Sequence, residues 1–282
     1  GDIFWCQGYS EPGSGSDLAS LQTRAVLDAS RENYVVNGQK IWTSHAHHAD
    51  WIFALVRTST EGKKQEGISF LLIDMLTPGL EVKPIISIDG GHYLNEVYFT
   101  DVKVPVANRI GEENLGWTYA KYLLGHERTG IAGVAKSKRK LEKLKEIAGL
   151  EQDSGEPLID DPNFKSKVAS VGIKLQALEV TNLRTLSAVS AGKSPGDASS
   201  ILKIRGTEVE QELNELLMQS IGYYAHPYQP GRLFNQQSNM IPVGGDHSVG
   251  LIEEHLLRRA ASIYGGSNEI QKNIIAKAIM GL

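Results

Sequence analysis

The sequence is poor in the features that mark several common protein classes. It contains one cysteine, Cys6, so an intramolecular disulfide is impossible and a reducing compartment is expected. Its 29 basic and 33 acidic residues give a formal net charge of −4, whereas nucleic-acid-binding domains are usually strongly basic. It has no apolar run of transmembrane length. We therefore expect a soluble, cytoplasmic protein that binds neither nucleic acid nor a membrane.

Two familiar ligand motifs are also missing. No G-x-G-x-x-G stands between a strand pattern and a helix pattern, so the dinucleotide-binding fingerprint is absent. His45, His47 and His48 lie close together, but no cysteine is near them and their spacing differs from the i, i+4 pair of a helical metal site. We interpret these histidines as polar loop residues and predict no metal centre.

The patterns that are present begin with strands. Between residue 1 and about residue 105, β-branched and aromatic runs alternate with Gly, Pro or charged turns, which predicts a small antiparallel barrel or sandwich. Asn37-Gly38 lies between two such runs and predicts a hairpin. The opening run IFWC, residues 3–6, is interpreted as a buried strand. Because a domain rarely opens in mid-core, we expect that a longer protein continues before residue 1.

Helical spacing takes over at about residue 115. Helices are predicted over about 115–150, 164–191, 197–221, 251–263 and 267–280. The connection at 222–247 is long for a compact domain, and such loops are usually functional or part of an interface. The fold class is therefore α+β, with a strand domain at residues 1–110 and a helical domain at residues 111–282.

Two motifs in the strand region could bind a ligand. The turn YSEPGSGSD, residues 9–17, could bring backbone N–H groups and hydroxyls to phosphate oxygens, or it could be a solvated loop. Trp42, followed by Thr43 and Ser44, could offer a ring face and hydroxyls to a flat aromatic ligand, or it could belong to the core.

A third motif places charge inside an apolar helix. Glu127 and Arg128 stand in the run LLGHERTGIAG. An unpaired buried carboxylate is costly, so Glu127 is either part of a structural ion pair or a general base in apolar surroundings.

These motifs, in this order, resemble the acyl-CoA dehydrogenase family. The resemblance runs through YSEPGSGSD, NGQKIWTS, FTDVKVPVANRIGEENLGW, HERTGIAG and IYGGSNEIQKNIIAKAIMGL, and it covers nearly the whole chain. It implies an antiparallel β-barrel middle domain followed by a C-terminal four-helix bundle, without the family's N-terminal helical domain. It also implies FAD-dependent dehydrogenation of an acyl-CoA thioester to the trans-2-enoyl-CoA. In that reaction a carboxylate removes the α-proton and flavin N5 accepts hydride.

The resemblance further implies a set of site residues. The expected FAD contacts are Gln7, Gly8, Tyr9, Ser10, Gly15, Ser16, Trp42, Thr43, Ser44, Ser267, Asn268 and Glu269. The expected substrate contacts are Ser16, Gly125, His126, Arg128 and Gly265.

The catalytic base requires a choice between two positions. In many family members the residue after the Tyr of the last motif is a catalytic Glu, but here that residue is Gly265. Other members carry the Glu on the helix with the Glu-Arg pair, where this chain has Glu127. The resemblance therefore implies Glu127 as the base, with Arg128 as its structural or charge-tuning neighbour.

Two departures from the family pattern concern assembly. The region EQDSGEPLIDDP is acidic where family homotetramers usually carry an Arg-x-x-Phe-Gly segment that holds a neighbour's FAD, and Tyr223 replaces the second Gly of a Gln-x-x-Gly-Gly segment. We expect a heteromer with two copies of each of two related subunits, of the kind that acts on steroid side-chain or pimeloyl thioesters. The alternative is a self-oligomer.

Other readings remain open. This chain could be a non-catalytic subunit that completes a neighbour's site, or a flavin monooxygenase or nitroalkane oxidase on the same scaffold. An electron-transfer flavoprotein-type acceptor is expected for the dehydrogenase. The acyl group is left open by the sequence.

Overall fold

The computed structural model describes residues 1–193, 199–229, 241 and 243–282, and for residues 125–129 and 131 it describes the backbone alone. The chain forms two compact units, Gly1–Ser87 with Gly91–Leu124, and Ile88–Gly90 with Gly125–Leu282. The first helix crosses from one unit into the other. The expected domain boundary between residues 110 and 111 stays a prediction.

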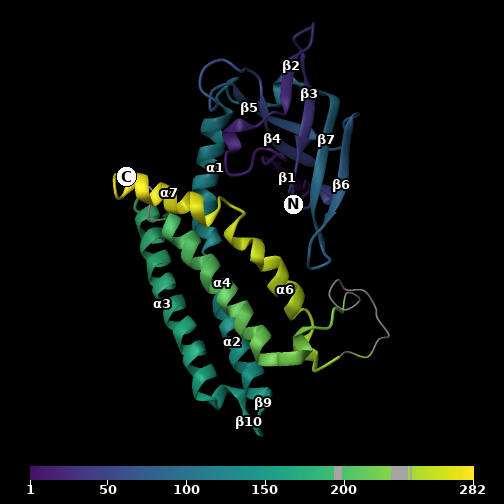
Figure 1. The fold of residues 1–282 in the computed structure, drawn as a ribbon. Helices are drawn as coiled ribbons and strands as arrows, with labels where there is room; N and C mark the ends of the chain where they lie inside the picture. Colours follow the sequence, from purple (N-terminus) through teal and green to yellow (C-terminus); the bar gives the residue numbers. More distant parts are fainter. Residues whose placement is uncertain (194–198, 230–240, 242) are drawn as a thin grey trace. The chain divides into compact units, whose positions relative to one another are not determined.

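The first unit is built on an eight-stranded sheet (Figure 1). Its strands are β1 (Trp5–Gly8), β2 (Arg24–Leu27), β3 (Asn33–Lys40), β4 (Trp51–Arg57), β5 (Ile68–Asp74), β6 (Leu80–Ile86), β7 (His92–Pro105) and β8 (Arg109–Ile110). They lie in the order β6-β7-β3-β2-β4-β5-β8, with β1 beside β4. Pairing is mostly antiparallel, but β1 runs parallel to β4, and β2 meets β4 at the parallel pair Arg24–Arg57.

The core of this unit follows from the alternation of side chains along the strands. In β3, for example, Tyr34 and Val36 are buried while their neighbours are partly or fully exposed. Ile52 on β4, Leu71 on β5 and Val97 on β7 join the same cluster, each fully buried. The strand runs expected from the sequence for β4 to β7 are confirmed.

The hairpin predicted at Asn37-Gly38 is wrong. β3 continues through both residues, and its pairing with β7 shifts register between Val36 and Gly38, where β7 carries one extra residue. Gly38 has φ +149°, and a Cβ there would lie 2.6 Å from the Cα of Thr23. The glycine therefore permits a close approach of backbone, and the reversal between β2 and β3 falls at residues 28–32 instead.

The prediction of a buried opening strand over residues 3–6 is also wrong in part. β1 begins at Trp5, and Ile3, Phe4 and Trp5 are 52, 48 and 39% exposed. Residues 3 and 4 precede the ladder that joins β1 to β4. Cys6 is buried, and this burial raises the pKa of its thiol to about 12, which makes it an unreactive core residue.

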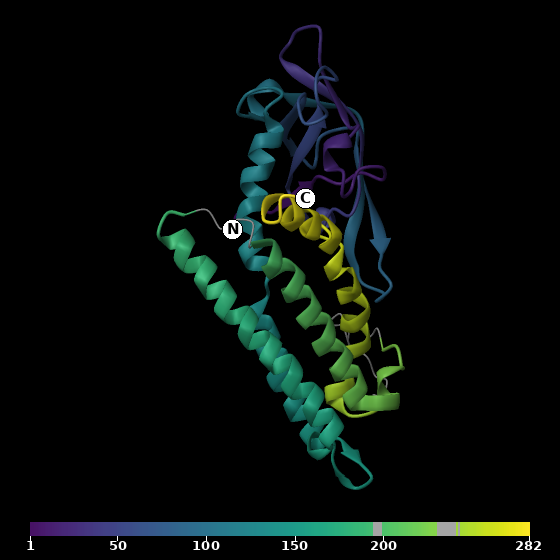
Figure 2. The same cartoon turned by 60° about the vertical axis from the view of Figure 1, so that its left-hand side comes forward.

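The second unit is helical, and its helices α2, α3 and α4 lie side by side (Figures 1 and 2). After α1 (Gly116–Ile131) come α2 (Val134–Leu150), α3 (Pro162–Ser190), α4 (Ser199–Ile221), α6 (Leu251–Arg258) and α7 (Asn268–Ala278). The predicted helix over 115–150 is thus two helices, separated at Gly133, whose φ is +59°. A hairpin of β9 (Gln152–Asp153) and β10 (Glu156–Pro157) follows α2.

Helix α4 is the centre of this unit. It contacts α2, α3, α6 and α7, and its buried residues Leu202, Val209 and Leu213 share one core with Leu144 of α2 and Leu175 of α3. The expected α+β class and the order of its parts are confirmed. In the part of the chain that is described, no helix combines the length and the apolar content that a membrane span needs.

Candidate cofactor and substrate site

The loop after β1 is tied to the end of β3 by a buried ion pair. The ammonium group of Lys40 lies 2.7 Å from Glu11 Oε1 and donates to the carbonyl oxygen of Tyr9 at 3.1 Å. The side chains of Lys40 and Glu11 are 0 and 6% exposed. The main-chain N–H of Ile41 donates to the carbonyl of Ser10 at 2.9 Å. Residues 9–11, within the first predicted cofactor segment, therefore have a fixed place beside the residues that follow β3.

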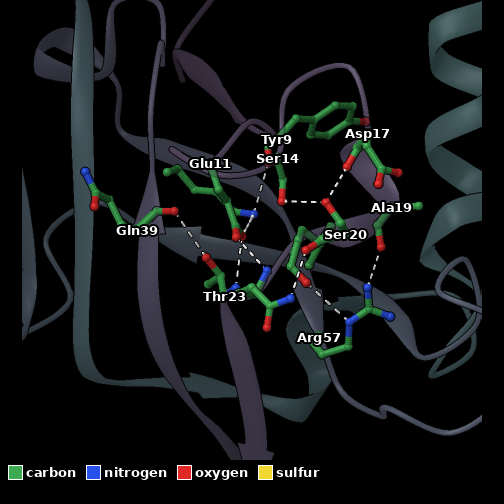
Figure 3. Close-up of polar contacts among 12 residues, drawn as sticks. Tyr9, Glu11, Ser14, Asp17, Ala19, Ser20, Thr23, Gln39 and Arg57 are labelled. Carbon is green, nitrogen blue, oxygen red and sulfur yellow. Dashed lines mark hydrogen bonds and ion pairs between the residues drawn. The ribbon is translucent and has the colours of Figure 1, made fainter.

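The Glu11 carboxylate also orders the inner part of this loop, as Figure 3 shows. It accepts hydrogen bonds from the main-chain N–H groups of Gln22 and Thr23. Burial raises the pKa of Glu11, but the charge of Lys40 and the hydrogen bonds outweigh burial and hold that pKa below its usual value of 4.5. Burial lowers the pKa of Lys40 to about 8 despite the nearby carboxylate. Both groups are thus charged at neutral pH.

The remaining predicted residues of the first cofactor segment differ in how exposed their side chains are. Gly8 is buried, and a Cβ there would lie 2.7 Å from Ile52 Cδ1, so this glycine lets β1 pack against β4. Gln7 and Ser10 are half-buried. Gly15 and Ser16 are exposed. Their contact with a ligand stays a prediction.

The turn after β3 carries the second predicted cofactor segment. Trp42 follows the end of β3 rather than lying in it, with φ +60°, and it is 56% exposed. Thr43 is 1% exposed, and within the described residues its buried hydroxyl oxygen has no hydrogen-bond partner. Ser44 is exposed. Buried hydroxyls are normally hydrogen-bonded, so an orphan beside an exposed indole ring fits a flat ligand with a polar edge.

Sequence reasoning missed the residue that holds this turn. Asn95 of β7 is fully buried, and its main-chain oxygen accepts the N–H of Thr43 at 3.0 Å. Its side-chain amide donates to the carbonyl of Thr43, also at 3.0 Å. Asn95 stands in no recognised motif, and 52 residues separate it from Thr43, so the sequence offered no local signal.

The histidines near this turn form a cluster rather than separate loop residues. His47 stacks on His92, with ring centroids 3.9 Å apart, and both rings are hydrogen-bonded to Asn95. Across the described residues, no three His, Cys, Asp or Glu side chains are placed to share a metal ion.

The last predicted segment lies at the start of α7. Gly265 and Gly266 have φ +65° and +79°, a backbone conformation that glycine reaches without strain. The hydroxyl of Ser267 caps α7 by accepting the N–H of Ile270 at 3.2 Å. Glu269 is exposed in the first turn, where its carboxylate accepts hydrogen bonds from its own main-chain N–H and from the Ser267 hydroxyl, which hold its pKa below 4.5.

Asn268 differs from its neighbours because it faces the interior. Its side-chain oxygen accepts from the buried ammonium group of Lys203 at 2.9 Å, and its amide bonds to Thr207 at 3.2 Å. The side chain therefore anchors α7 to α4. A contact of Asn268 with a cofactor stays a prediction.

The acidic region that departs from the family pattern forms the β9–β10 hairpin and its flanks. At its start, Glu151 Oε1 lies 2.6 Å from His247 Nε2, so part of the segment is engaged within its own unit. Tyr223, at the other departure, is 89% exposed.

The predicted catalytic and substrate residues Gly125, His126, Glu127 and Arg128 belong to α1 by their backbone. Their side chains lie outside the described residues, so their roles rest on the sequence.

Comparison with models of protein families identifies the family of this chain. Residues 6–102 match the model for the acyl-CoA dehydrogenase middle domain, and residues 114–280 match the model for the acyl-CoA dehydrogenase C-terminal domain. The chain belongs to the acyl-CoA dehydrogenase family. The resemblance drawn from its motifs is confirmed.

Individual acyl-CoA dehydrogenases agree with this assignment. FadE26 of Mycobacterium tuberculosis is 38% identical over 295 residues, covering 100% of this chain and 69% of that protein. A crystal structure of the ChsE4-ChsE5 complex from Mycobacterium tuberculosis gives a TM-score of 0.83 at 34% identity, covering 100% of this chain and 69% of that one. The structure of the Tcur3481-Tcur3483 steroid ACAD gives a TM-score of 0.84 at 30% identity, covering 100% of this chain and 68% of that one. This chain spans about two thirds of the length of these relatives.

Proposed function

We propose that this protein is an FAD-dependent acyl-CoA dehydrogenase that acts on a bulky, steroid-derived thioester as one subunit of a heteromeric enzyme. Support for the substrate and the assembly comes from the solved relatives, one described as a complex and another as a steroid ACAD. The observation that carries the cofactor assignment is the Trp42–Thr43 turn. An exposed ring and an orphaned buried hydroxyl stand together at the residues that match the family's flavin contacts.

The residues of the strand unit would bind and orient the cofactor. Trp42 offers its ring face to the isoalloxazine, and the Thr43 hydroxyl offers a hydrogen bond at the ring's polar edge. The main chain of residues 7–10, held by Lys40 and Glu11, lines the same ligand. Bound FAD supplies the acceptor for the hydride that leaves the substrate β-carbon.

Glu127 would hold the proton that leaves the substrate α-carbon. A thioester α-proton is weakly acidic, so the base works best where water is excluded, and the helix around Glu127 is apolar in sequence. Gly265 stands where many family members carry the base, and its φ of +65° disfavours a Glu there. Arg128 is the neighbouring charge on the same helix.

A second candidate function follows from the β9–β10 segment. Its acids stand where homotetrameric relatives carry a segment that holds a neighbour's FAD, so this chain could complete an assembly without catalysing the reaction. An intact Trp42-Thr43-Ser44 motif and Glu127 favour the catalytic role. An electron-transfer flavoprotein-type acceptor and a cytoplasmic location remain predictions from the sequence.

The test is an anaerobic titration of the protein, alone and co-purified with a related subunit, against steroid side-chain and straight-chain acyl-CoA thioesters. The dehydrogenase predicts loss of the flavin's visible absorption band with the steroid thioester. FAD binding without bleaching by any thioester favours the site-completing subunit. Rapid reaction of the reduced flavin with oxygen would instead favour an oxidase or monooxygenase.

A further inference from the structure

We propose that Asn95 is a positioning residue for the flavin-contacting turn at Trp42–Ser44, and that protonation of His47 releases this turn. The inference rests on the proposed function, since it concerns the residues assigned to the flavin. The supporting observation is the group of hydrogen bonds that the buried side-chain amide of Asn95 makes with Thr43, His92 and His47.

Asn95 binds both main-chain polar groups of Thr43. Its carbonyl accepts the Thr43 N–H at 3.0 Å, and its Nδ2 donates to the Thr43 carbonyl at 3.0 Å. Asn95 is fully buried, so water cannot replace it readily. The main chain of Thr43 is therefore satisfied by one residue, which leaves its side-chain hydroxyl as the group available to a ligand.

The Thr43 carbonyl also fixes the protons on two histidines. A carbonyl accepts only, so the amide nitrogen of Asn95 must point toward Thr43 and its oxygen must point away. The oxygen lies 2.8 Å from His92 Nε2, so His92 donates. The amide nitrogen lies 3.1 Å from His47 Nδ1, so His47 must accept there. His47 is thus neutral, with its proton on Nε2, whereas His92 keeps its bond when protonated.

The surroundings keep His47 neutral near pH 7. Burial lowers the pKa of His47 below 6.5, and the charges of His92, His48 and His45 act in the same direction. The hydrogen bond that Nδ1 accepts from Asn95 also favours the neutral ring. His48 lies in the 3-10 turn η2 (Ala46–His48), and its ring is 4.0 Å from that of His47.

Among the described residues, the strands packed against η2 bring no carboxylate that acts on the pKa of His47. On β6, Glu81 and Lys83 pair with each other at 3.5 Å. On β7, Glu96 accepts hydrogen bonds from Gln39 and Tyr98. β1, which also packs on η2, reads WCQG and contributes no charge.

Protonation of His47 breaks this set. A proton on Nδ1 would face the Asn95 amide nitrogen, placing two donors together. Turning the amide would relieve that contact, but it would set the amide oxygen against the Thr43 carbonyl and the amide nitrogen against the His92 donor. Either arrangement costs a hydrogen bond in a buried place, and such losses are expensive. The turn should therefore loosen in mild acid and hold the flavin less firmly.

The experiment uses three variants of the full chain. His47→Asn places an oxygen where Nδ1 stands, so it keeps the acceptor but cannot take the proton. Asn95→Asp replaces the amide that donates to Thr43 with a carboxylate, which in its ionised form only accepts hydrogen bonds. His48→Gln is the matched control, because His48 touches the His47 ring and has no described bond to Asn95.

Two quantities are measured between about pH 8 and about pH 5, the range that brackets a histidine with a lowered pKa. They are the Kd for FAD and, without FAD, the hydrogen exchange of main-chain amides at residues 42–45. In the wild type and in His48→Gln, the Kd should rise about tenfold in acid as one buried bond is lost, and exchange should quicken. His47→Asn should show neither change, and Asn95→Asp should show weak binding and fast exchange throughout.

Parallel acid responses in the wild type and His47→Asn would overturn the inference, as would wild-type behaviour in Asn95→Asp. Exchange that responds as expected while no variant binds FAD would support the Asn95 contacts but overturn the proposed flavin function. The two failures are therefore distinguishable.

Discussion

Lys40 Nζ and Glu11 Oε1 form a buried ion pair at 2.7 Å that joins the end of β3 to the loop after β1. The two residues are 29 positions apart in the sequence, and each borders a segment that we predict to contact the flavin. The pair is thus the physical link between the first and second halves of the candidate cofactor site within the strand unit.

Loss of one partner of this pair should be costly. Lys40→Met leaves the Glu11 carboxylate buried and unpaired, and we expect a loss of about 3–5 kcal/mol in the free energy of unfolding. Adding Glu11→Gln should recover part of it. Urea unfolding measures the effect.

The matched control is Lys64→Met, because Lys64 pairs with Asp17 at 2.6 Å but both side chains are more than half exposed. It should cost less than about 1 kcal/mol. Equal losses in the two variants would contradict the assignment of the Lys40 pair as a structural anchor.

The same pair should shape the response to acid. The pKa of Glu11 in the folded protein lies below its usual 4.5, so Glu11 contributes stability that is complete above pH 4.5 and is lost as pH falls below it. Glu11→Gln should start less stable at neutral pH but lose less stability below pH 4.5. Unfolding curves across this range that stay parallel would show that Glu11 does not titrate with folding.

Gly38 provides a test of the close backbone approach between β3 and Thr23. A Cβ at this position would lie 2.6 Å from the Cα of Thr23, and backbone cannot move aside easily. We expect Gly38→Ala to destabilise the protein by about 1–3 kcal/mol or more, measured by thermal unfolding. Gly15→Ala is the control, since a Cβ there meets nothing within 4 Å. A harmless Gly38→Ala would contradict the close approach of this glycine to the backbone of Thr23.

The sequence was informative where the signal was local. Runs of β-branched and aromatic residues predicted β4 to β7, and helical spacing predicted α3, whose start is marked by Asp161 and Pro162. The hairpin prediction at Asn37-Gly38 was wrong because Gly38 allows the backbone to pass close to Thr23 on the neighbouring segment. A dipeptide cannot show whether its glycine turns the chain or admits a neighbour.

The candidate site could be predicted only in part for the same reason. Trp42 and Thr43 were identified through family motifs, but Asn95, which holds Thr43, is brought there by the pairing of distant strands. Asn268 sits inside a family motif, yet its side chain turns to Lys203, a contact that requires the packing of α7 on α4.

The proposed dehydrogenase is tested most directly by the rate of flavin bleaching after anaerobic mixing with a steroid side-chain acyl-CoA, comparing the wild type with Glu127→Gln. Glu146→Gln, an exposed acid on α2, is the control. Glu127→Gln should keep its FAD and bleach about 10²–10⁴-fold more slowly, because the group that takes the α-proton is gone, while the control matches the wild type. Bleaching of Glu127→Gln at the wild-type rate would show that another group is the base.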